Sequence, residues 1–241
     1  MCMRMLFYGG FMQNTKNSTG YFHLKEIALW ASSAALIIVS FCLFDRANYT
    51  TLAASLIGVS SLILNAKGHP IGQALMIIFS LLYGIISYSF RYYGEMLTYL
   101  GMTMPMAVFS LISWIRHPYE GKRSEVKVNA IGKREVLLML LASAVVTCAF
   151  YFILVRFKTA NIIPSTISVT TSFIAAYLTF RRSPYFALAY AANDVVLIVL
   201  WIMASVENTV YISVVVCFST FLINDIYGFL SWKRMKARQT A

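Results

Sequence analysis

Two Asn-Asp pairs lie deep inside apolar stretches of this sequence. Asn193 and Asp194 fall near the middle of the run S-P-Y-F-A-L-A-Y-A-A-N-D-V-V-L-I-V-L-W over residues 183–201, and Asn224 and Asp225 lie within a second apolar run. A carboxylate in hydrocarbon is costly, so it normally faces a protein interior or a water-filled cavity. The pairs therefore predict a polar binding site inside a membrane domain.

Aromatic residues accompany the first pair. If residues 183–201 form a helix, Tyr190, Asp194 and Trp201 lie on one stripe, at spacings of four and seven, with Asn193 beside it. The stripe combines rings that can stack with acceptors that can hold hydroxyl groups. The alternative is that the two pairs bond to each other or to neighbouring backbone and only lock the bundle together.

The composition requires a membrane setting for these residues. Of the 241 residues, 59% are hydrophobic and 12% are charged, a balance typical of a polytopic membrane protein. The net charge of +11 does not indicate nucleic-acid binding, because the basic residues lie between apolar spans rather than in one patch. The partner that the composition implies is the lipid bilayer.

Eight apolar runs approach the length of about 20 residues that a helix needs to cross a membrane. The expected fold is therefore all-α and integral to the membrane, with eight transmembrane helices. The predicted spans are about Glu26–Phe44, Thr51–Ala66, Pro70–Phe90, Leu97–Ile115, Glu135–Val155, Pro164–Phe180, Ser183–Ala204 and Val210–Trp232.

The distribution of basic residues predicts the orientation. With eight spans both termini lie on one side, and all 20 Lys and Arg residues fall on that side except Arg46, Arg91, Arg156 and Lys158. By the positive-inside rule the termini and the long loop between the fourth and fifth spans are cytoplasmic. We expect a multi-pass membrane protein with both termini in the cytoplasm.

The sequence also repeats itself. A shift of 114 positions places Pro70 on Pro184 and Lys67 on Arg181, while Ser113-Trp114 matches Ser231-Trp232 at a slightly larger offset. Four spans per half give both halves the same orientation, so the repeats are parallel, a transporter architecture whose site lies near the midplane between the halves. The expected segments are a leader (1–24), a first repeat (25–116), a basic loop (117–134), a second repeat (135–232) and a tail (233–241).

The first half lacks the polar pairs at the matching positions. Phe79 aligns with Asn193 and Met106 aligns with Asn224, so we expect polar recognition from the second half and an apolar or aromatic wall from the first. The predicted substrate-binding residues are Gln73, Phe79, Tyr83, Tyr190, Asn193, Asp194, Trp201, Asn224 and Asp225.

Several kinds of chemistry are excluded. The sequence has no G-x-x-x-x-G-K-[ST] phosphate loop, no G-x-S-x-G and no H-E-x-x-H, so we expect neither an ATPase nor another enzyme. Its four cysteines show no C-x-x-C spacing, and no metal or other cofactor is expected. No Lys or Arg lies deep within a span, so a phosphate at the midplane would have no cationic partner. The solute is expected to be neutral or cationic.

The repeat, the segment S-P-Y-F-A-L-A-Y-A-A-N-D and the ending N-D-I-Y-G-F-L-S-W-K-R at 224–234 resemble the PnuC family of nicotinamide riboside (nicotinamide mononucleotide) transporters, relatives of the SWEET sugar transporters. The resemblance implies a core of three helices, a linker helix and three helices, here with one additional leading helix. Asn193 matches the Asn of the family's W-x-x-x-N motif, although Ala189 stands where the motif has Trp.

The resemblance further implies a protein of the bacterial inner (plasma) membrane. It also implies facilitated diffusion of nicotinamide riboside by alternating access, with metabolic trapping by a cytosolic kinase. Other solutes stay open, namely a (deoxy)nucleoside, thiamine or riboflavin. A different class of function also stays open, in which the chain is the substrate-binding subunit of an ATP-driven importer. The sequence leaves the oligomeric state undecided, with a homo-oligomer as one option.

Overall fold

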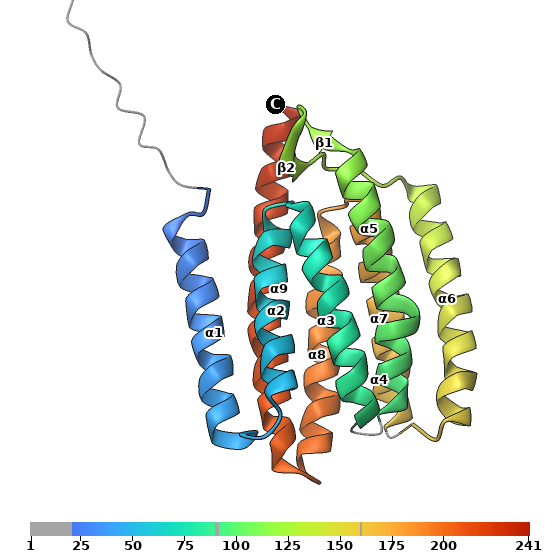
Figure 1. The fold of residues 1–241 in the computed structure, drawn as a ribbon. Coiled ribbons are helices and arrows are strands. Elements are labelled where there is room, and N and C mark those ends of the chain that lie inside the picture. The colour runs from blue at the N-terminus through green and yellow to red at the C-terminus, as the bar shows by residue number, and fades with distance from the viewer. Residues whose placement is uncertain (1–20, 90–91, 160) are drawn as a thin grey trace, which may run out of the picture.

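The computed structural model describes residues 21–89, 92–159 and 161–241, so most of the predicted leader and the predicted end of the third span at Phe90 lie outside the described residues. The described part contains eight helices that are long and apolar enough to cross a membrane, which confirms the predicted count. They stand side by side along one axis (Figure 1). Their bounds are α1 (Leu24–Phe44), α2 (Tyr49–Ala66), α3 (Pro70–Ser89), α4 (Tyr93–Thr98) continuing through the π-helix η1 (Tyr99–Thr103) into α5 (Met104–Arg116), α6 (Lys133–Arg156), α7 (Ile162–Phe180), α8 (Tyr185–Ser205), and the 3-10 turn η2 (Thr209–Tyr211) leading into α9 (Ile212–Thr240).

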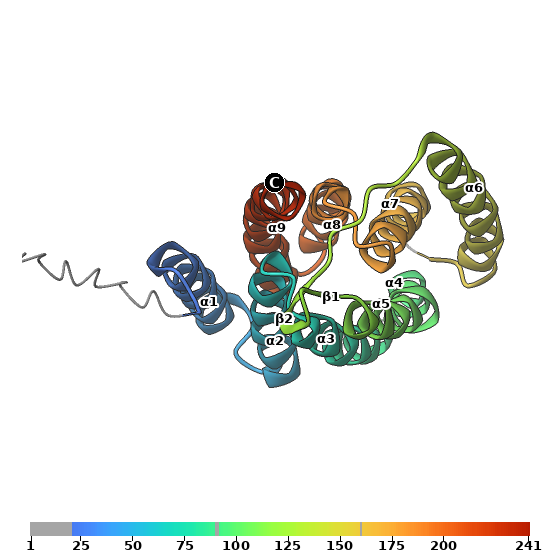
Figure 2. The same cartoon turned by 90° about the horizontal axis from the view of Figure 1, so that it is seen from above.

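The two halves form two facing rows of helices. Viewed from above, α2, α3 and α4–α5 lie opposite α9, α8 and α7, while α1 and α6 stand at the two ends (Figure 2). Two equivalent helix pairs join the rows, since α2 packs against α9 and α5 packs against α7. In the repeat, α2 corresponds to α7 and α5 corresponds to α9. The arrangement of the repeats therefore follows the internal similarity seen in the sequence.

Equivalent side chains in the two halves make equivalent contacts between helices. The indole Nε1 of Trp114 donates to the carbonyl of Thr179 at 3.0 Å, and the indole Nε1 of Trp232 donates to the carbonyl of Asn65 at 2.7 Å. Lys67 forms an ion pair with Glu26, and Arg181 forms the equivalent pair with Glu135. Residues that the sequence repeat paired thus make the same contact in both halves.

The fourth span begins earlier than predicted and contains a wide turn. Residues from Tyr93 to Arg116 form one continuous span, in which the N–H of Met104 donates to the carbonyl of Tyr99, five residues back. Pro105 explains the wide turn because proline has no N–H to donate to the carbonyl four residues before it. Turns of this kind often occur at functional sites.

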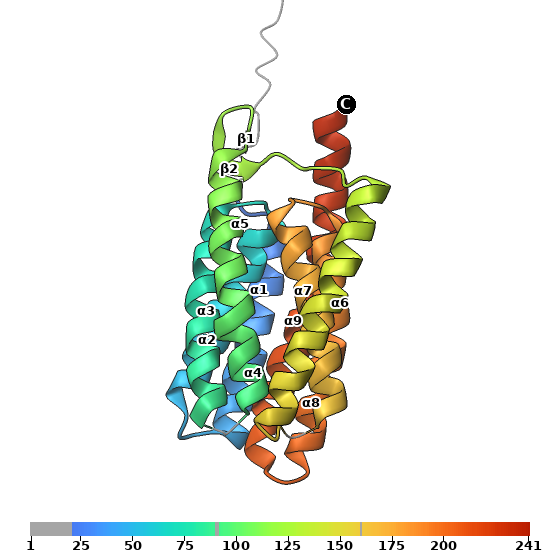
Figure 3. The same ribbon diagram turned by 90° about the vertical axis from the view of Figure 1, so that its right-hand side faces the viewer.

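The loop between the halves is more ordered than predicted, since it contains a β-hairpin. β1 (Pro118–Tyr119) pairs antiparallel with β2 (Lys122–Val126), and both turn residues, Glu120 and Gly121, have positive φ angles, as a two-residue hairpin turn requires. The loop then crosses both rows (Figures 2 and 3). It bonds to equivalent turns of the two halves, because the Val126 N–H donates to the carbonyl of Gly68 and the Asn129 N–H to that of Arg182.

The segment predicted as a tail, 233–241, is helical through Thr240 as the last part of α9. Gln239 fastens it to the loop, since its amide nitrogen donates to Glu125 at 2.8 Å and its amide oxygen accepts from the Val128 N–H at 2.8 Å. The C-terminus and the central loop therefore form one layer at the same end of the bundle (Figure 3).

Candidate functional site

A small cavity of about 30 Å³ lies between the two rows, near the middle of the bundle. The second half contributes polar groups to it from α7, α8 and α9, and the first half contributes mainly apolar and aromatic groups from α2, α3 and η1. The lining residues are Leu62, Met76, Phe79, Tyr99, Thr103, Ser172, Tyr190, Asn193, Asp194, Phe218, Phe221 and Asp225.

The carboxyl groups of Asp194 and Asp225 are the central feature of the cavity. Both side chains are buried, and the two carboxyls interact directly across the α8–α9 contact. Among the described residues, no hydrogen-bond donor reaches the Oδ2 atom of Asp194, and no Lys or Arg lines the cavity. Two carboxylates this close repel each other, so a cation or a shared proton between them is stabilising.

Asn193 is held in place by α7. Its side-chain oxygen accepts hydrogen bonds from the Thr171 hydroxyl at 2.8 Å and the Ser172 hydroxyl at 3.0 Å. None of the hydrogen bonds among the described residues uses its amide nitrogen. This arrangement fixes the amide and leaves its nitrogen available to donate to an oxygen atom of a ligand.

The opposite wall is aromatic, as the loss of polarity at Phe79 predicted. The Phe79 ring lies 5.6 Å from the Phe221 ring and 5.9 Å from the Tyr99 ring, centroid to centroid. Tyr190 adds a further ring from the polar side. A planar cationic or aromatic ring could stack against such a wall.

Of the nine residues predicted for the site, the structure brings five to the cavity, namely Phe79, Tyr190, Asn193, Asp194 and Asp225. The other four are buried elsewhere among the described residues. Gln73 donates to the Asn65 side chain at 2.9 Å, which joins α3 to α2. Asn224 donates to the hydroxyl of Ser33 at 2.9 Å, which joins α9 to α1. These two amides are placed to support the bundle.

Tyr83 and Trp201 belong to an aromatic cluster beside the cavity. Their rings meet edge to face at 6.3 Å between centroids, and Trp201 also contacts Tyr92 and Tyr211 at the end of the bundle away from the C-terminus. These rings fill that end of the space between the rows. Tyr83 and Trp201, which were predicted to contact the solute, therefore pack beside the cavity and do not line it.

Several cavity residues were not predicted. Tyr99 and Thr103 are brought in by the π-helix, and Ser172 is brought in by the bonds that hold Asn193. Pro105 in an apolar span was the available signal for the π-helix. Glu95, which the sequence placed in a loop, is buried on α4, and neither carboxylate oxygen has a hydrogen-bond partner among the described residues.

The cavity is too small for an organic ligand in this conformation. Pockets that enclose small organic ligands typically measure about 300–1,000 Å³, whereas this cavity of about 30 Å³ has room for one or two water molecules. A vitamin-sized ligand can enter only after the helix rows or their side chains move apart.

A membrane bundle of two like halves, with buried polar groups in a cavity between them, defines a transporter. Residues 48–234 match the family model described as nicotinamide mononucleotide transporter, and because this match spans most of the chain, the protein belongs to that family. The family consists of transporters rather than enzymes.

Two further comparisons agree with this assignment. The chain is 24% identical over 225 residues to a protein of Neisseria mucosa named nicotinamide riboside transporter PnuC, an alignment that covers 92% of this chain and 85% of that protein. Its fold is similar to the crystal structure of the vitamin B3 transporter PnuC, with a TM-score of 0.79 and 23% identity over 90% of this chain and 94% of the other.

Proposed function

We propose that this protein takes up nicotinamide riboside by facilitated diffusion with alternating access, and that a cytosolic kinase then traps the solute by phosphorylation. The observation that carries the proposal is the contact between Asp194 and Asp225 in a cavity that has an aromatic wall. The pyridinium ring of nicotinamide riboside is flat and positively charged, so it offers a cation to the carboxyl pair and a face to the Phe79 side.

The charge of the cavity favours the riboside over the mononucleotide. A mononucleotide would bring a phosphate next to two carboxyl groups, and none of the cavity-lining residues among those described is basic. Such an uncompensated anion is costly in a low-dielectric interior. The riboside places hydroxyl groups there instead, which the amide nitrogen of Asn193 can meet.

The small volume of the cavity and the likeness of the two rows support alternating access. The rows meet through α2–α9 and α5–α7, so rocking one row against the other would expose the cavity to either side in turn. The positive-inside rule favours cytoplasmic termini in a bacterial inner membrane. The solute is then released into the cytoplasm, where a kinase can phosphorylate it.

Transport by the purified protein in liposomes tests this proposal. We expect labelled nicotinamide riboside to equilibrate across the membrane without ATP and without an imposed ion gradient. Unlabelled riboside should compete, whereas thymidine, thiamine and riboflavin should not. Competition by thymidine alone would instead identify a nucleoside carrier. Failure to transport without an ATPase would identify an importer subunit, and uphill uptake driven by a pH gradient would contradict simple facilitation.

A further inference from the structure

A second cleft lies at the end of the bundle that carries the C-terminus, between the last turns of α5 and α7, and has a volume of about 440 Å³. We call it the α5/α7 cleft. Three arginines line its polar part, namely Arg116, Arg181 and Arg182, and no carboxylate is among its lining residues. The two helices lie side by side below the hairpin (Figure 3).

Two of the three arginines lack an acidic partner in the described structure. Arg181 pairs with Glu135 of α6, but Arg182 donates to neutral groups, the Ser113 hydroxyl at 2.6 Å and the Lys127 carbonyl at 3.2 Å. Arg116 makes no hydrogen bond or ion pair with any described residue. Burial, and then repulsion from Arg181, lower the pKa of Arg182. The cleft therefore holds positive charge that the protein does not neutralise.

Two carbonyl groups at the end of α7 next to the cleft are already hydrogen-bonded to α5. The C-terminal end of a helix presents unpaired carbonyls and a partial negative charge. In α7 the carbonyl of Thr179 accepts from the Trp114 indole, and the carbonyl of Phe180 accepts from the Ser113 hydroxyl at 2.9 Å. These two carbonyls are therefore paired within the protein.

The other side of the cleft is apolar and faces the membrane. Phe109 and Ile112 line it from α5 and are exposed on the outside of a membrane span, and Phe180 lines it from α7. Basic and apolar surfaces thus adjoin at the level where a span ends, which is where lipid phosphates lie.

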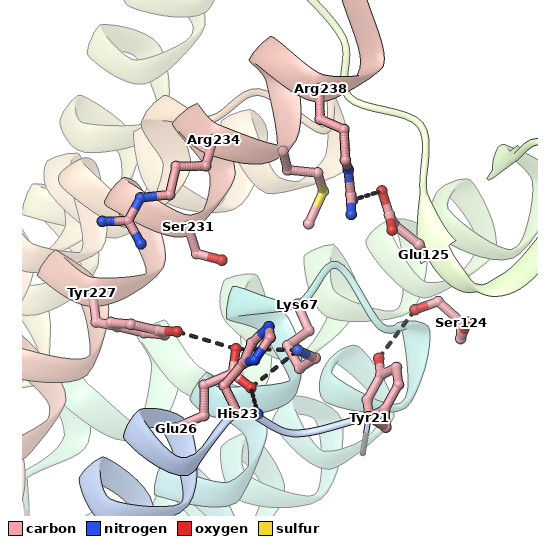
Figure 4. A pocket seen from close by; sticks show the side chains of 11 residues that line it. Tyr21, His23, Glu26, Lys67, Ser124, Glu125, Tyr227, Ser231, Arg234 and Arg238 are labelled. Atoms are coloured by element: carbon pink, nitrogen blue, oxygen red, sulfur yellow. Dashed lines mark hydrogen bonds and ion pairs between the residues drawn. The ribbon is translucent and has the colours of Figure 1, made fainter. Parts of the chain in front are cut away.

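The equivalent pocket of the other half differs because carboxylates are among its lining residues. It lies between α1, α2 and α9, and two carboxylates occupy it, with Glu26 bound to Lys67 and Glu125 bound to Arg238 (Figure 4). Burial, and then the charges of Glu125 and Glu26, raise the pKa of Tyr21 to about 12. The repeat pairs Arg234 of this pocket with Arg116 of the α5/α7 cleft, so the two positions differ mainly in the acids around them.

We propose that the α5/α7 cleft binds an anionic phospholipid. The lipid phosphate lies between Arg116 and Arg182, in a cleft whose lining residues include no carboxylate. Its acyl chain lies along Phe109, Ile112 and Phe180. The lipid would fasten the end of α5 to α7, next to the turn from which the loop crosses between the halves.

Native mass spectrometry of the purified protein tests the site. We expect phosphatidylglycerol to bind more tightly than zwitterionic phosphatidylethanolamine. Arg116→Gln should weaken phosphatidylglycerol binding about fivefold, the usual effect of one basic residue at an anionic membrane surface. Arg116→Lys, which keeps the charge, should bind nearly as the wild type does. The matched control is Arg234→Gln, which removes the equivalent arginine and should leave phosphatidylglycerol binding unchanged.

The same experiment distinguishes a lipid from a soluble anion. Inorganic phosphate and glycerol phosphate should not displace the bound lipid, because neither can occupy the apolar side of the cleft. Displacement by either one would overturn the lipid assignment. Equal binding of phosphatidylglycerol by the wild type and Arg116→Gln, or equal losses in Arg116→Gln and Arg234→Gln, would overturn the site itself.

Discussion

The two halves of this transporter are alike at the end of the bundle that carries the C-terminus and different in the middle. At that end, the Trp114 and Trp232 indoles bond to equivalent carbonyls, and the turns at Gly68 and Arg182 share a left-handed backbone with φ angles of +68° and +56°. In the middle, Asn193 and Asp194 of the second half stand where the first half has Phe79 and Ser80. The duplicated contacts build the frame, and the residues that differ between the halves form the cavity.

The difference makes the two sides of the cavity chemically unlike. A fully symmetric site would present either four acids or none. Here both cavity acids, Asp194 and Asp225, come from the second half, and the first half has Ser80 and Ala107 at the matching positions. A flat cation can then meet carboxylates on one face and the Phe79 ring on the other. Duplication followed by divergence of a few central residues is sufficient to produce such a site.

The largest expected effect is on the free energy of unfolding, and it differs between the two equivalent ion pairs, Lys67–Glu26 and Arg181–Glu135. The Glu26 side chain is 3% exposed and that of Glu135 is 22% exposed. Lys67→Met leaves the buried Glu26 carboxylate without its cation and should lower the free energy of unfolding by about 3 kcal/mol. Arg181→Met should lower it by about 1 kcal/mol or less, because Glu135 can be solvated. Chemical unfolding in mixed micelles measures both, and equal losses would contradict the difference in burial.

The next largest effect is on uptake, and it should differ between the matching positions Asp194 and Ser80 in the middle of the two halves. Asp194→Ala should reduce nicotinamide riboside uptake about 10- to 100-fold, the loss expected from a hydrogen bond or contact to a charged group worth roughly 1.5–3 kcal/mol. Ser80→Ala at the matching position should leave uptake nearly unchanged, because Ser80 does not line the cavity. Unchanged uptake by Asp194→Ala in liposomes would remove the proposed site.

A third prediction tests whether the equivalent hydrogen bonds of Trp114 and Trp232 contribute equally to stability. Trp114→Phe and Trp232→Phe each remove one hydrogen bond to a carbonyl that keeps a backbone donor, the Arg182 N–H or the Gly68 N–H. Each should cost about 1–1.5 kcal/mol of unfolding free energy. The two losses should be similar, as measured by the same unfolding assay. A loss of unfolding free energy in one variant and none in the other would show that the two hydrogen bonds are not equivalent.

The smallest expected effect concerns the aromatic wall. Phe79→Leu keeps the wall apolar but removes the ring, and should raise the KM for uptake about fivefold, which corresponds to roughly 1 kcal/mol of lost ring interaction. The neighbouring Ile78 is exposed on the membrane side of α3, so Ile78→Val serves as the control and should leave the KM unchanged. A KM unaffected by Phe79→Leu would argue against stacking of the solute on this wall.

Much of the frame was predictable because it depends on local properties of the sequence. Hydropathy gave the eight spans, and the shared positions of Pro70 with Pro184 and Lys67 with Arg181 indicated the repeat. The hairpin was missed because the basic loop was treated as connecting chain, although Glu120-Gly121 is a suitable two-residue turn. The π-helix was missed because a proline inside a span has more than one structural outcome.

The site was only partly predictable because a helical stripe specifies a face but not a depth. Tyr190, Asp194 and Trp201 share a face of α8, yet Trp201 lies seven residues beyond Asp194, about 10 Å along the axis at 1.5 Å per residue. It therefore joins the outer aromatic cluster with Tyr92. Asn224 is adjacent to Asp225, but successive helical residues point about 100° apart, so it faces α1 instead.

Binding calorimetry with a charged and an uncharged ligand tests the central claim most directly. The wild type should bind nicotinamide riboside more tightly than its reduced form, which has the same sugar and a neutral ring. Asp225→Asn should abolish that preference, because it removes one of the two carboxylates that attract the ring. Equal affinity of the wild type for the two ligands, or the same preference in Asp225→Asn, would contradict recognition of the cation by the acidic pair.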